Sequence, residues 1–246
     1  MCLSLRQQLQ QHHRDEAAAL AGPLQELRLA VASGGRAVYL VAPAAPTGDA
    51  APRPRRAPAA VVIDAITGVL QLWAGDDKVR AVLFEGRGSK GFCAGGDVRA
   101  VRQAILDGKR GEADHFFASE YAMNGLIATY PKPVVAIADG VVMGGGIGVA
   151  GHARYRFTTP QARFAMPEAA IGLFCDVGVN ELLRKAPEHR ALLFELSGHA
   201  VGAADALALG LSDCVVARDR ISILREGVVA AAYSGKVDAA LARAME

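Results

Sequence analysis

The sequence is poor in cysteine. Its 246 residues include only Cys2, Cys93, Cys175 and Cys214, which are widely spaced and form no CxxC pair. This pattern indicates neither a disulfide framework nor a zinc site, and we expect no bound metal. Reduced thiols fit a cytoplasmic protein best.

Aromatic residues and net charge are also scarce. Phe, Trp and Tyr make up 6% of the chain, and the formal net charge is +2. No strong electrostatic field points to nucleic acid or to an anionic membrane, and few rings are available for stacking on bases. We therefore expect no nucleic-acid partner.

Signals for secretion or membrane insertion are weak. The first eight residues turn polar too early for a signal peptide. The stretch from Val134 to Ala150 is nearly all apolar, but it contains Asp139 and five glycines and follows Pro131 and Pro133. It predicts a buried strand, a glycine turn and the start of a buried helix, not a membrane span.

Apolar residues are abundant, at 52% of the chain. This content and length predict one α/β domain. We divide the chain into an N-terminal helical segment with a strand and a Pro-rich linker (1–57), a core (58–200) and a C-terminal helical region (201–246).

The hydrophobic pattern predicts short apolar strands that alternate with helices. Such crossover connections imply largely parallel sheets buried on both faces. Expected helices cover residues 5–32, 61–72, about 97–107, 113–129, a start near 145, 179–185, 188–197, 203–208 and 219–232. Expected strands cover residues 36–41, 79–85, 134–138, 155–158, 163–165 and 213–216.

Two glycine-rich turns follow expected strands. In Ala94-Gly95-Gly96-Asp97, Asp97 is placed to cap the next helix, and the Gly96 N–H would then face a ligand oxygen. In Gly144-Gly145-Gly146, the Gly145 N–H is free if it lies in the first helical turn. Two N–H groups aimed at one point would form an oxyanion hole. Ala94, Gly95, Asp97, Gly144 and Gly146 are candidate substrate-binding residues around it.

Two carboxylates, Glu168 and Asp176, lie in an otherwise apolar segment. An acid surrounded by apolar residues is costly to bury unless it is paired or has a functional role, so both are functional candidates. The alternative is that each acid caps a helix. Cys93 and Cys175 are expected to be small buried residues rather than nucleophiles, and His152 to be packed or hydrogen-bonded.

Four ordered motifs carry a resemblance to a known family. The segment Pro131-Lys132-Pro133-Val134-Val135-Ala136, the GGG turn, FCAGGD and FAMPE together resemble the enoyl-CoA hydratase/isomerase (crotonase) superfamily over about residues 58–225. The resemblance implies a ββα superhelix and an acyl-CoA thioester substrate. It also implies an oxyanion hole at Gly96 and Gly145. Coenzyme A would be part of the substrate, with no other cofactor bound.

The resemblance also points to one branch of the superfamily. Gly148 replaces an acid of the hydratases, whereas Glu168 matches their second glutamate. The pattern FAMPExxIGLFxDVG is similar to the 3-hydroxyisobutyryl-CoA hydrolases, which makes Glu168 the catalytic carboxylate and Asp176 its partner. Glu168 would attack the carbonyl or activate water. Asp176 would orient Glu168 or water, or raise the Glu168 pKa.

Some positions depart from that pattern. Cys175 replaces a proline, Val179 replaces a glycine, and the C-terminal helical region is shorter than the family's. Relatives commonly form trimers or hexamers, so a homo-oligomer is expected. Two alternatives remain: an enoyl-CoA hydratase or isomerase that works with Glu168 alone, and a non-catalytic binding protein with the same fold.

Overall fold

The computed structural model describes residues 30–31, 38–43, 59–77, 79–87 and 91–245. The helix expected before residue 30 and most of the Pro-rich linker lie outside these residues. The predicted domain boundary at residue 57 also lies outside them.

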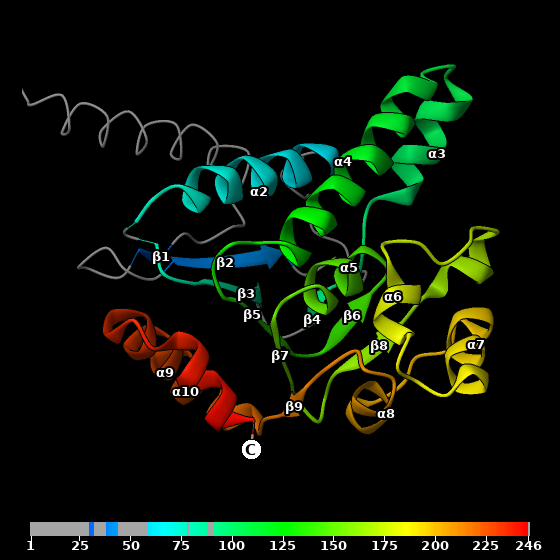
Figure 1. Ribbon diagram of the computed structural model, residues 1–246. Helices are drawn as coiled ribbons and strands as arrows, with labels where there is room; N and C mark the ends of the chain where they lie inside the picture. The colour runs from blue at the N-terminus through cyan, green and yellow to red at the C-terminus, as the bar shows by residue number, and fades with distance from the viewer. Residues whose placement is uncertain (1–29, 32–37, 44–58, 78, 88–90, 246) are drawn as a thin grey trace, which may run out of the picture.

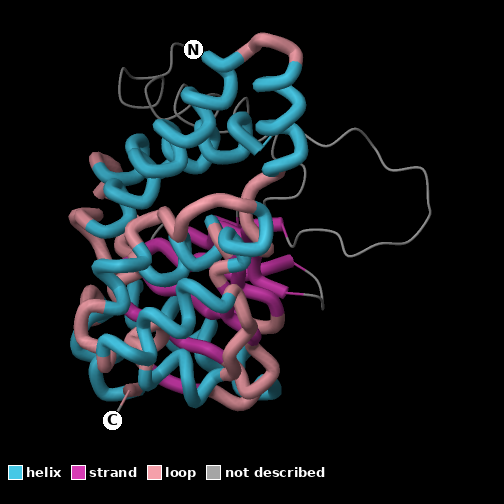
Figure 2. The backbone as a smooth tube through the Cα atoms, turned by 90° about the vertical axis from the view of Figure 1, so that its right-hand side faces the viewer, coloured by secondary structure: helices cyan, strands magenta, loops and turns pink. Residues whose placement is uncertain are grey.

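A six-stranded sheet forms the centre of the molecule (Figure 1). Its order is β1-β2-β3-β5-β7-β9, and only the β1–β2 pair is antiparallel. The turned view of Figure 2 shows the strands running through the middle of the molecule with helices around them. The strands are β1 (Ala30–Val31), β2 (Val38–Pro43), β3 (Val82–Arg87), β5 (Val134–Ala138), β7 (Tyr155–Thr158) and β9 (Cys214–Val215).

Each face of this sheet has its own apolar core, because side chains alternate along a strand. On one face, Val82 and Phe84 pack in a cluster with residues of α2 (Ala59–Ala74) and α4 (Arg110–Ala128). On the other face, Leu83 packs in a cluster with residues of α9 (Ile221–Ser234) and α10 (Val237–Ala244). The sheet is thus buried on both sides, as the continuous apolar strands predict.

A second sheet of three parallel strands carries the glycine turns. Its order is β4 (Gly91–Cys93), β6 (Val141–Met143) and β8 (Arg163–Ala165). Together the two sheets and their helices confirm the α/β fold class. The remaining elements are α3 (Val98–Leu106), α5 (Gly145–Gly151), η1 (Pro167–Ile171), α6 (Val179–Leu183), α7 (Glu188–Ser197), α8 (Ala203–Ala208) and η2 (Arg218–Arg220).

The structure corrects the predicted pattern at a few short elements. Ala30 and Val31, expected to be helical, pair with β2 as a strand. The strands β4 and β6 and the helix α10 were not predicted. Three-residue strands beside glycine turns show too few alternations to indicate a strand, so tertiary pairing decides them.

The apolar stretch from 134 to 150 forms the predicted strand β5, the glycine turn and most of the helix α5, with the additional strand β6 between β5 and the turn. Among the described residues, none of the helices combines the length and apolar character needed to cross a bilayer.

Candidate functional site

The three segments that carry the predicted site residues leave the same edge of the small sheet. Met143 of β6 pairs with Ala165 of β8, and Cys93 of β4 pairs with Val142. The Gly144 N–H donates to Ala165 O at 3.1 Å. Because carboxyl ends of parallel strands share an edge, the FCAGGD turn, the GGG turn and the FAMPE segment converge there.

The first turn is built around Gly96 and Asp97. Asp97 Oδ1 accepts the Ala100 N–H at 3.1 Å and caps α3, as predicted. A Cβ at Gly96 would come 2.4 Å from Phe116 Cζ, so this position has no room for a side chain. Within the described part of the chain, the Gly96 N–H has no protein acceptor.

The second turn lies directly beside the first. A Cβ at Gly95 would come 3.3 Å from Gly145 N. Gly144 has φ +49°, a left-handed conformation that favours glycine. Gly145 is the first residue of α5, where an N–H has no helical acceptor, and no acceptor for it occurs among the described residues.

Glu168 faces the second turn from η1. A Cβ at Gly144 would come 2.9 Å from Glu168 Oε1. Glu168 is 8% exposed, and its Oε2 is buried without a partner among the described residues. Burial first, and then the negative charge of Asp176, raise the pKa of Glu168, although its own backbone N–H opposes the shift.

Asp176 is held by a tyrosine rather than by a helix end. The Tyr121 hydroxyl donates to Asp176 Oδ2 at 2.8 Å. The N-cap of α6 is Gly178, and no side chain bonds to that helix start. The alternative in which Asp176 caps the following helix therefore has no support. The Asp176 charge acts on both Glu168 and Glu120 and raises the pKa of each.

Glu120 is a third carboxylate that the motifs did not reveal. It lies on α4 and is 6% exposed. A Cβ at Gly145 would come 2.2 Å from Glu120 Oε1. Burial, followed by the charges of Asp176 and Glu168, raises the pKa of Glu120 to about 7. A carboxyl group that holds its proton near neutrality is suited to acid–base work.

Helix α4 presents three side chains, four residues apart, to the glycines of the site. Such spacing puts them on one face of the helix. Two of them, Glu120 and Asn124, are polar residues among the apolar residues that α4 buries, and no sequence motif singled them out. Phe116 packs against Gly96, Glu120 against Gly145, and Asn124 against Gly148.

Gly148 is enclosed. A Cβ there would come 2.7 Å from Asn124 Nδ2, 2.9 Å from Asn124 Oδ1 and 2.9 Å from Val177 Cβ. No acid fits at this position unless its neighbours move. Asn124 is 4% exposed, and neither amide atom has a partner among the described residues.

Comparisons with known proteins agree with this arrangement. The enoyl-CoA hydratase/isomerase family model matches residues 56–246. The chain belongs to the enoyl-CoA hydratase/isomerase family. Two similar curated proteins are the mitochondrial 3-hydroxyisobutyryl-CoA hydrolase of Xenopus tropicalis and 3-hydroxyisobutyryl-CoA hydrolase 1 of Arabidopsis thaliana. The first is 42% identical over 163 residues, or 65% of this chain and 42% of its own length. The second is 41% identical over 162 residues, which make up 65% of this chain and 43% of the relative's own length.

Solved structures of similar sequence share this fold. A carnitinyl-CoA dehydratase from Mycobacterium thermoresistibile has a TM-score of 0.73 and 38% identity over 88% of this chain and 60% of that one. An enoyl-CoA hydratase from Rhodobacter sphaeroides 2.4.1 has a TM-score of 0.73 and 30% identity over 86% of this chain and 59% of that one. The matched region spans less than half the length of the curated relatives named above.

The thiols near this family site are half-buried, whereas the sequence predicted small buried residues. Burial raises the pKa of Cys93, and it raises that of Cys175 to about 11 with help from neighbouring carboxylates. Cys175 Sγ also donates to Glu195 O at 3.4 Å. Because the reactive form is the thiolate, neither residue is primed for attack. No group of His, Cys, Asp or Glu among the described residues is arranged to hold a metal ion.

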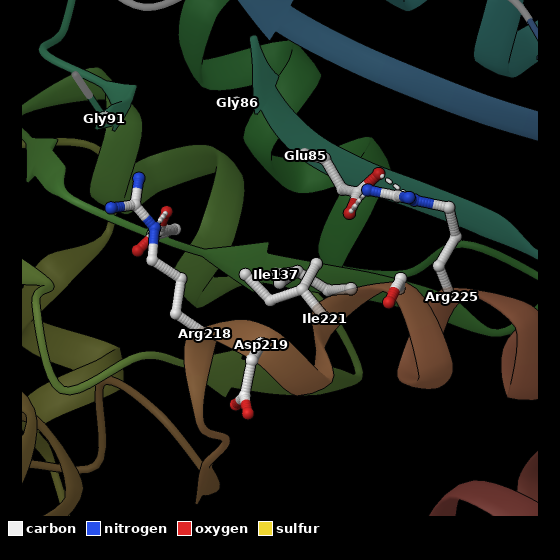
Figure 3. Close-up of a pocket in the computed structure, with 10 residues that line it drawn as sticks. Glu85, Gly86, Gly91, Ile137, Arg218, Asp219, Ile221 and Arg225 are labelled. Carbon is white, nitrogen blue, oxygen red and sulfur yellow. Dashed lines mark hydrogen bonds and ion pairs between the residues drawn. The ribbon is translucent and has the colours of Figure 1, made fainter. Parts of the chain in front are cut away.

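A separate pocket of about 430 Å³ lies at the ends of β3 and β5 and the start of α9 (Figure 3). Arg225 forms a bidentate ion pair with Glu85 at 2.9 and 3.0 Å, and Arg218 pairs with Asp139 at 2.9 Å. In these two ion pairs, charged side chains that line the pocket neutralise one another. The pocket shares no lining residue with the carboxylate site. It is lined by Glu85, Gly86, Gly91, Ile137, Asp139, Arg218, Asp219, Ile221, Ser222 and Arg225.

Proposed function

We propose that this family member hydrolyses a short 3-hydroxyacyl-CoA thioester. The observation that carries the proposal is the packing of Glu168 and Glu120 against the Gly144-Gly145 turn, with the Asp176 charge acting on both. The relatives named as 3-hydroxyisobutyryl-CoA hydrolases support the choice of acyl group.

The N–H groups of Gly96 and Gly145 would hold the thioester oxygen. Both lack acceptors among the described residues, and their turns are adjacent. As the carbonyl carbon becomes tetrahedral, negative charge develops on this oxygen, and preorganised donors lower the barrier. Removing one such donor costs about two to three orders of magnitude in rate.

Glu168 would either be the nucleophile or activate a water molecule as the nucleophile. Its unpartnered Oε2 is free either to attack the carbonyl carbon or to take a proton from an attacking water. In both routes the carbon–sulfur bond breaks and the thiolate takes a proton. When Glu168 activates water, the new carboxylate oxygen of the product comes from that water. When Glu168 attacks, hydrolysis of the anhydride at the enzyme's carboxyl carbon leaves a Glu168 oxygen in the product and puts the water oxygen into Glu168. After a single turnover in H₂¹⁸O, label in Glu168 identifies the anhydride route with hydrolysis at the enzyme's carboxyl carbon, whereas label in the product alone excludes hydrolysis at that carbon.

In this step Glu120 would act as a proton donor, and Asp176 would act through its negative charge. With its pKa raised to about 7, Glu120 holds a proton for part of the time at neutral pH, and in this proposal it would give that proton to the leaving sulfur. Asp176, fixed by Tyr121, adds negative charge that keeps the proton affinity of the other two carboxylates high.

The alternative is an enoyl-CoA hydratase or isomerase that uses Glu168 alone. The names and shared fold of the solved relatives favour it. The packing at Gly148 argues against the two-acid form of that chemistry, because Asn124 and Val177 occupy the space that a side chain on residue 148 would need.

An acyl-CoA panel tests the proposal. Purified protein should release free thiol from 3-hydroxyisobutyryl-CoA or another short 3-hydroxyacyl-CoA, and Glu168→Gln should abolish release. Glu112→Gln, an exposed change on α4, serves as the control and should leave the rate unchanged. Loss of the enoyl absorbance of crotonyl-CoA, without thiol release, would support the hydratase alternative instead. Absence of both reactions would favour the non-catalytic alternative.

Partners and location follow from the same proposal. Coenzyme A enters as part of the substrate, and no other cofactor is proposed. We retain the homo-oligomer and the cytoplasmic location as predictions. The Xenopus tropicalis relative is named as mitochondrial, so fractionation of cells that express this protein is the deciding measurement for location.

A further inference from the structure

Val177 has a strained backbone. Its φ is +48°, and no other non-glycine residue among those described has a positive φ. A β-branched side chain in this region of the backbone map is a genuine outlier. Such strain persists only when neighbouring groups hold it in place.

The strained residue directly follows Asp176. Its side chain is 2% exposed, and its Cβ lies against Gly148. The next residue, Gly178, is also left-handed, with φ +73°. The chain therefore turns sharply immediately after the proposed partner acid, and the direction of that turn sets where the carboxylate points.

His152 holds this turn. Its Nε2 lies 2.7 Å from Val177 O. A carbonyl oxygen only accepts hydrogen bonds, so Nε2 carries the proton and donates. The ring also packs on Gly178, where a Cβ would come 2.9 Å from Nε2. His152 is the C-cap of α5, the helix that begins at Gly145, so the bond links the turn to the glycine helix.

The Asp176 side chain has a separate restraint. The Tyr121 hydroxyl donates to it from α4 at 2.8 Å. One contact thus fixes the backbone after Asp176, and another fixes the carboxylate itself.

We propose that His152 is a positioning residue that holds Val177 in its left-handed conformation and thereby aims Asp176 at Glu168 and Glu120. The inference rests on the proposed function for its kinetic consequence but not for its structural one. His152 does not touch the proposed reacting atoms and acts through the Val177 carbonyl.

The test compares two substitutions at His152. In His152→Gln, the side-chain amide nitrogen reaches the place of Nε2 and still donates; in His152→Leu, no donor remains. His152→Leu should lower kcat by about 100-fold, as expected for a misplacement of about 1 Å, with KM changed by less than about threefold. His152→Gln should recover most of kcat. His199→Leu, at an exposed histidine, should change neither value.

Tyr121→Phe tests the second restraint. Because both residues act on Asp176, the double variant His152→Leu/Tyr121→Phe should lose less in kcat than the product of the two single losses. If the two losses multiply instead, the residues act independently and the proposal is wrong.

Amide hydrogen exchange gives a readout that needs no activity. The Val179 N–H donates to Asp176 O at 3.0 Å and closes the turn. Its exchange should rise at least about tenfold in His152→Leu and stay near the wild-type rate in His152→Gln. Unchanged exchange in His152→Leu would overturn the proposal, whether or not the protein hydrolyses thioesters. Should His152→Leu not fold, His152→Asn, whose amide is too short to reach Val177 O, takes its place.

Discussion

Glu120 on α4 and Gly145 at the start of α5 are packed so tightly that a methyl group on Gly145 would come 2.2 Å from Glu120 Oε1. A buried acid thus touches the residue whose N–H is the proposed oxyanion donor. Glycine is required here because the carboxylate occupies the place of a side chain. The third acid of the site thus comes from α4, outside the motif segments.

Gly145→Ala should abolish turnover and destabilise the fold. The added methyl group must displace Glu120 or the GGG turn, which we expect to cost about 1–3 kcal/mol of unfolding free energy and at least about 100-fold in kcat. Gly125→Ala is the matched control, since it lies in α4 with open space around it. That change should raise the unfolding free energy by about 0.5–1 kcal/mol. Urea unfolding and thiol release measure both effects.

Glu120→Gln should change how stability depends on pH. In the folded protein the pKa of Glu120 is raised to about 7, whereas the unfolded chain loses this proton near 4.5. Between these values the folded state binds more protons, so wild-type stability should fall as the pH rises, by on the order of 3 kcal/mol. The glutamine variant lacks this contribution, and urea unfolding at pH 5 and pH 8 should show a smaller loss.

The kinetic counterpart is a pH–rate profile. If Glu120 supplies a proton, the wild-type rate should fall above about pH 7, and this limb should disappear in Glu120→Gln while a lower, flatter rate remains. Glu112→Gln, exposed on the same helix, should leave both profiles as in the wild type. A limb that persists in Glu120→Gln assigns the titration to another group.

Asn124→Leu should stabilise the protein. Both amide atoms of Asn124 are buried without partners among the described residues, and such groups cost about 1–3 kcal/mol. Leucine has a similar shape and no polar atoms, so we expect the unfolding free energy to rise by about 1 kcal/mol. Asn124→Asp, of nearly the same size, should lower it because a charge would be buried beside Glu120. Lower stability in Asn124→Leu would show that the amide has a partner in solution.

Arg156→Lys should loosen the link between β7 and β9. The Arg156 guanidinium donates to both Asp213 oxygens, through Nε at 3.1 Å and through Nη2, and to Gly210 O at 2.6 Å. A lysine cannot reproduce this fork, so we expect a loss of about 1.5–3 kcal/mol in unfolding free energy. Arg184→Lys is the control, because its pair with Glu181 is exposed and worth at most about 1 kcal/mol.

Local sequence signals were sufficient for much of this molecule. Apolar runs predicted the buried strands β5, β7 and β8 at their observed bounds, and Asp97 marked the start of α3. The two glycine turns indicated where backbone N–H groups would be exposed. Each of these features depends on neighbours within a few residues, so short-range chemistry is enough to predict it.

The remainder of the site depends on packing between distant segments. Tyr121 and Asp176 are 55 residues apart, and their contact exists only because α4 lies against the segment between η1 and α6. Glu120 and Asn124 look like ordinary polar residues of a long helix until Gly145 and Gly148 are placed against them.

The sequence by itself determined the α/β class, the glycine turns and the presence of Glu168 and Asp176 in an apolar segment. Only the tertiary structure decided that Glu120 joins them, that Gly148 has no room for an acid, and that His152 holds the strained turn at Val177. The physical reason is that a side chain's burial and partners, and with them its pKa, come from contacts between segments far apart in the chain.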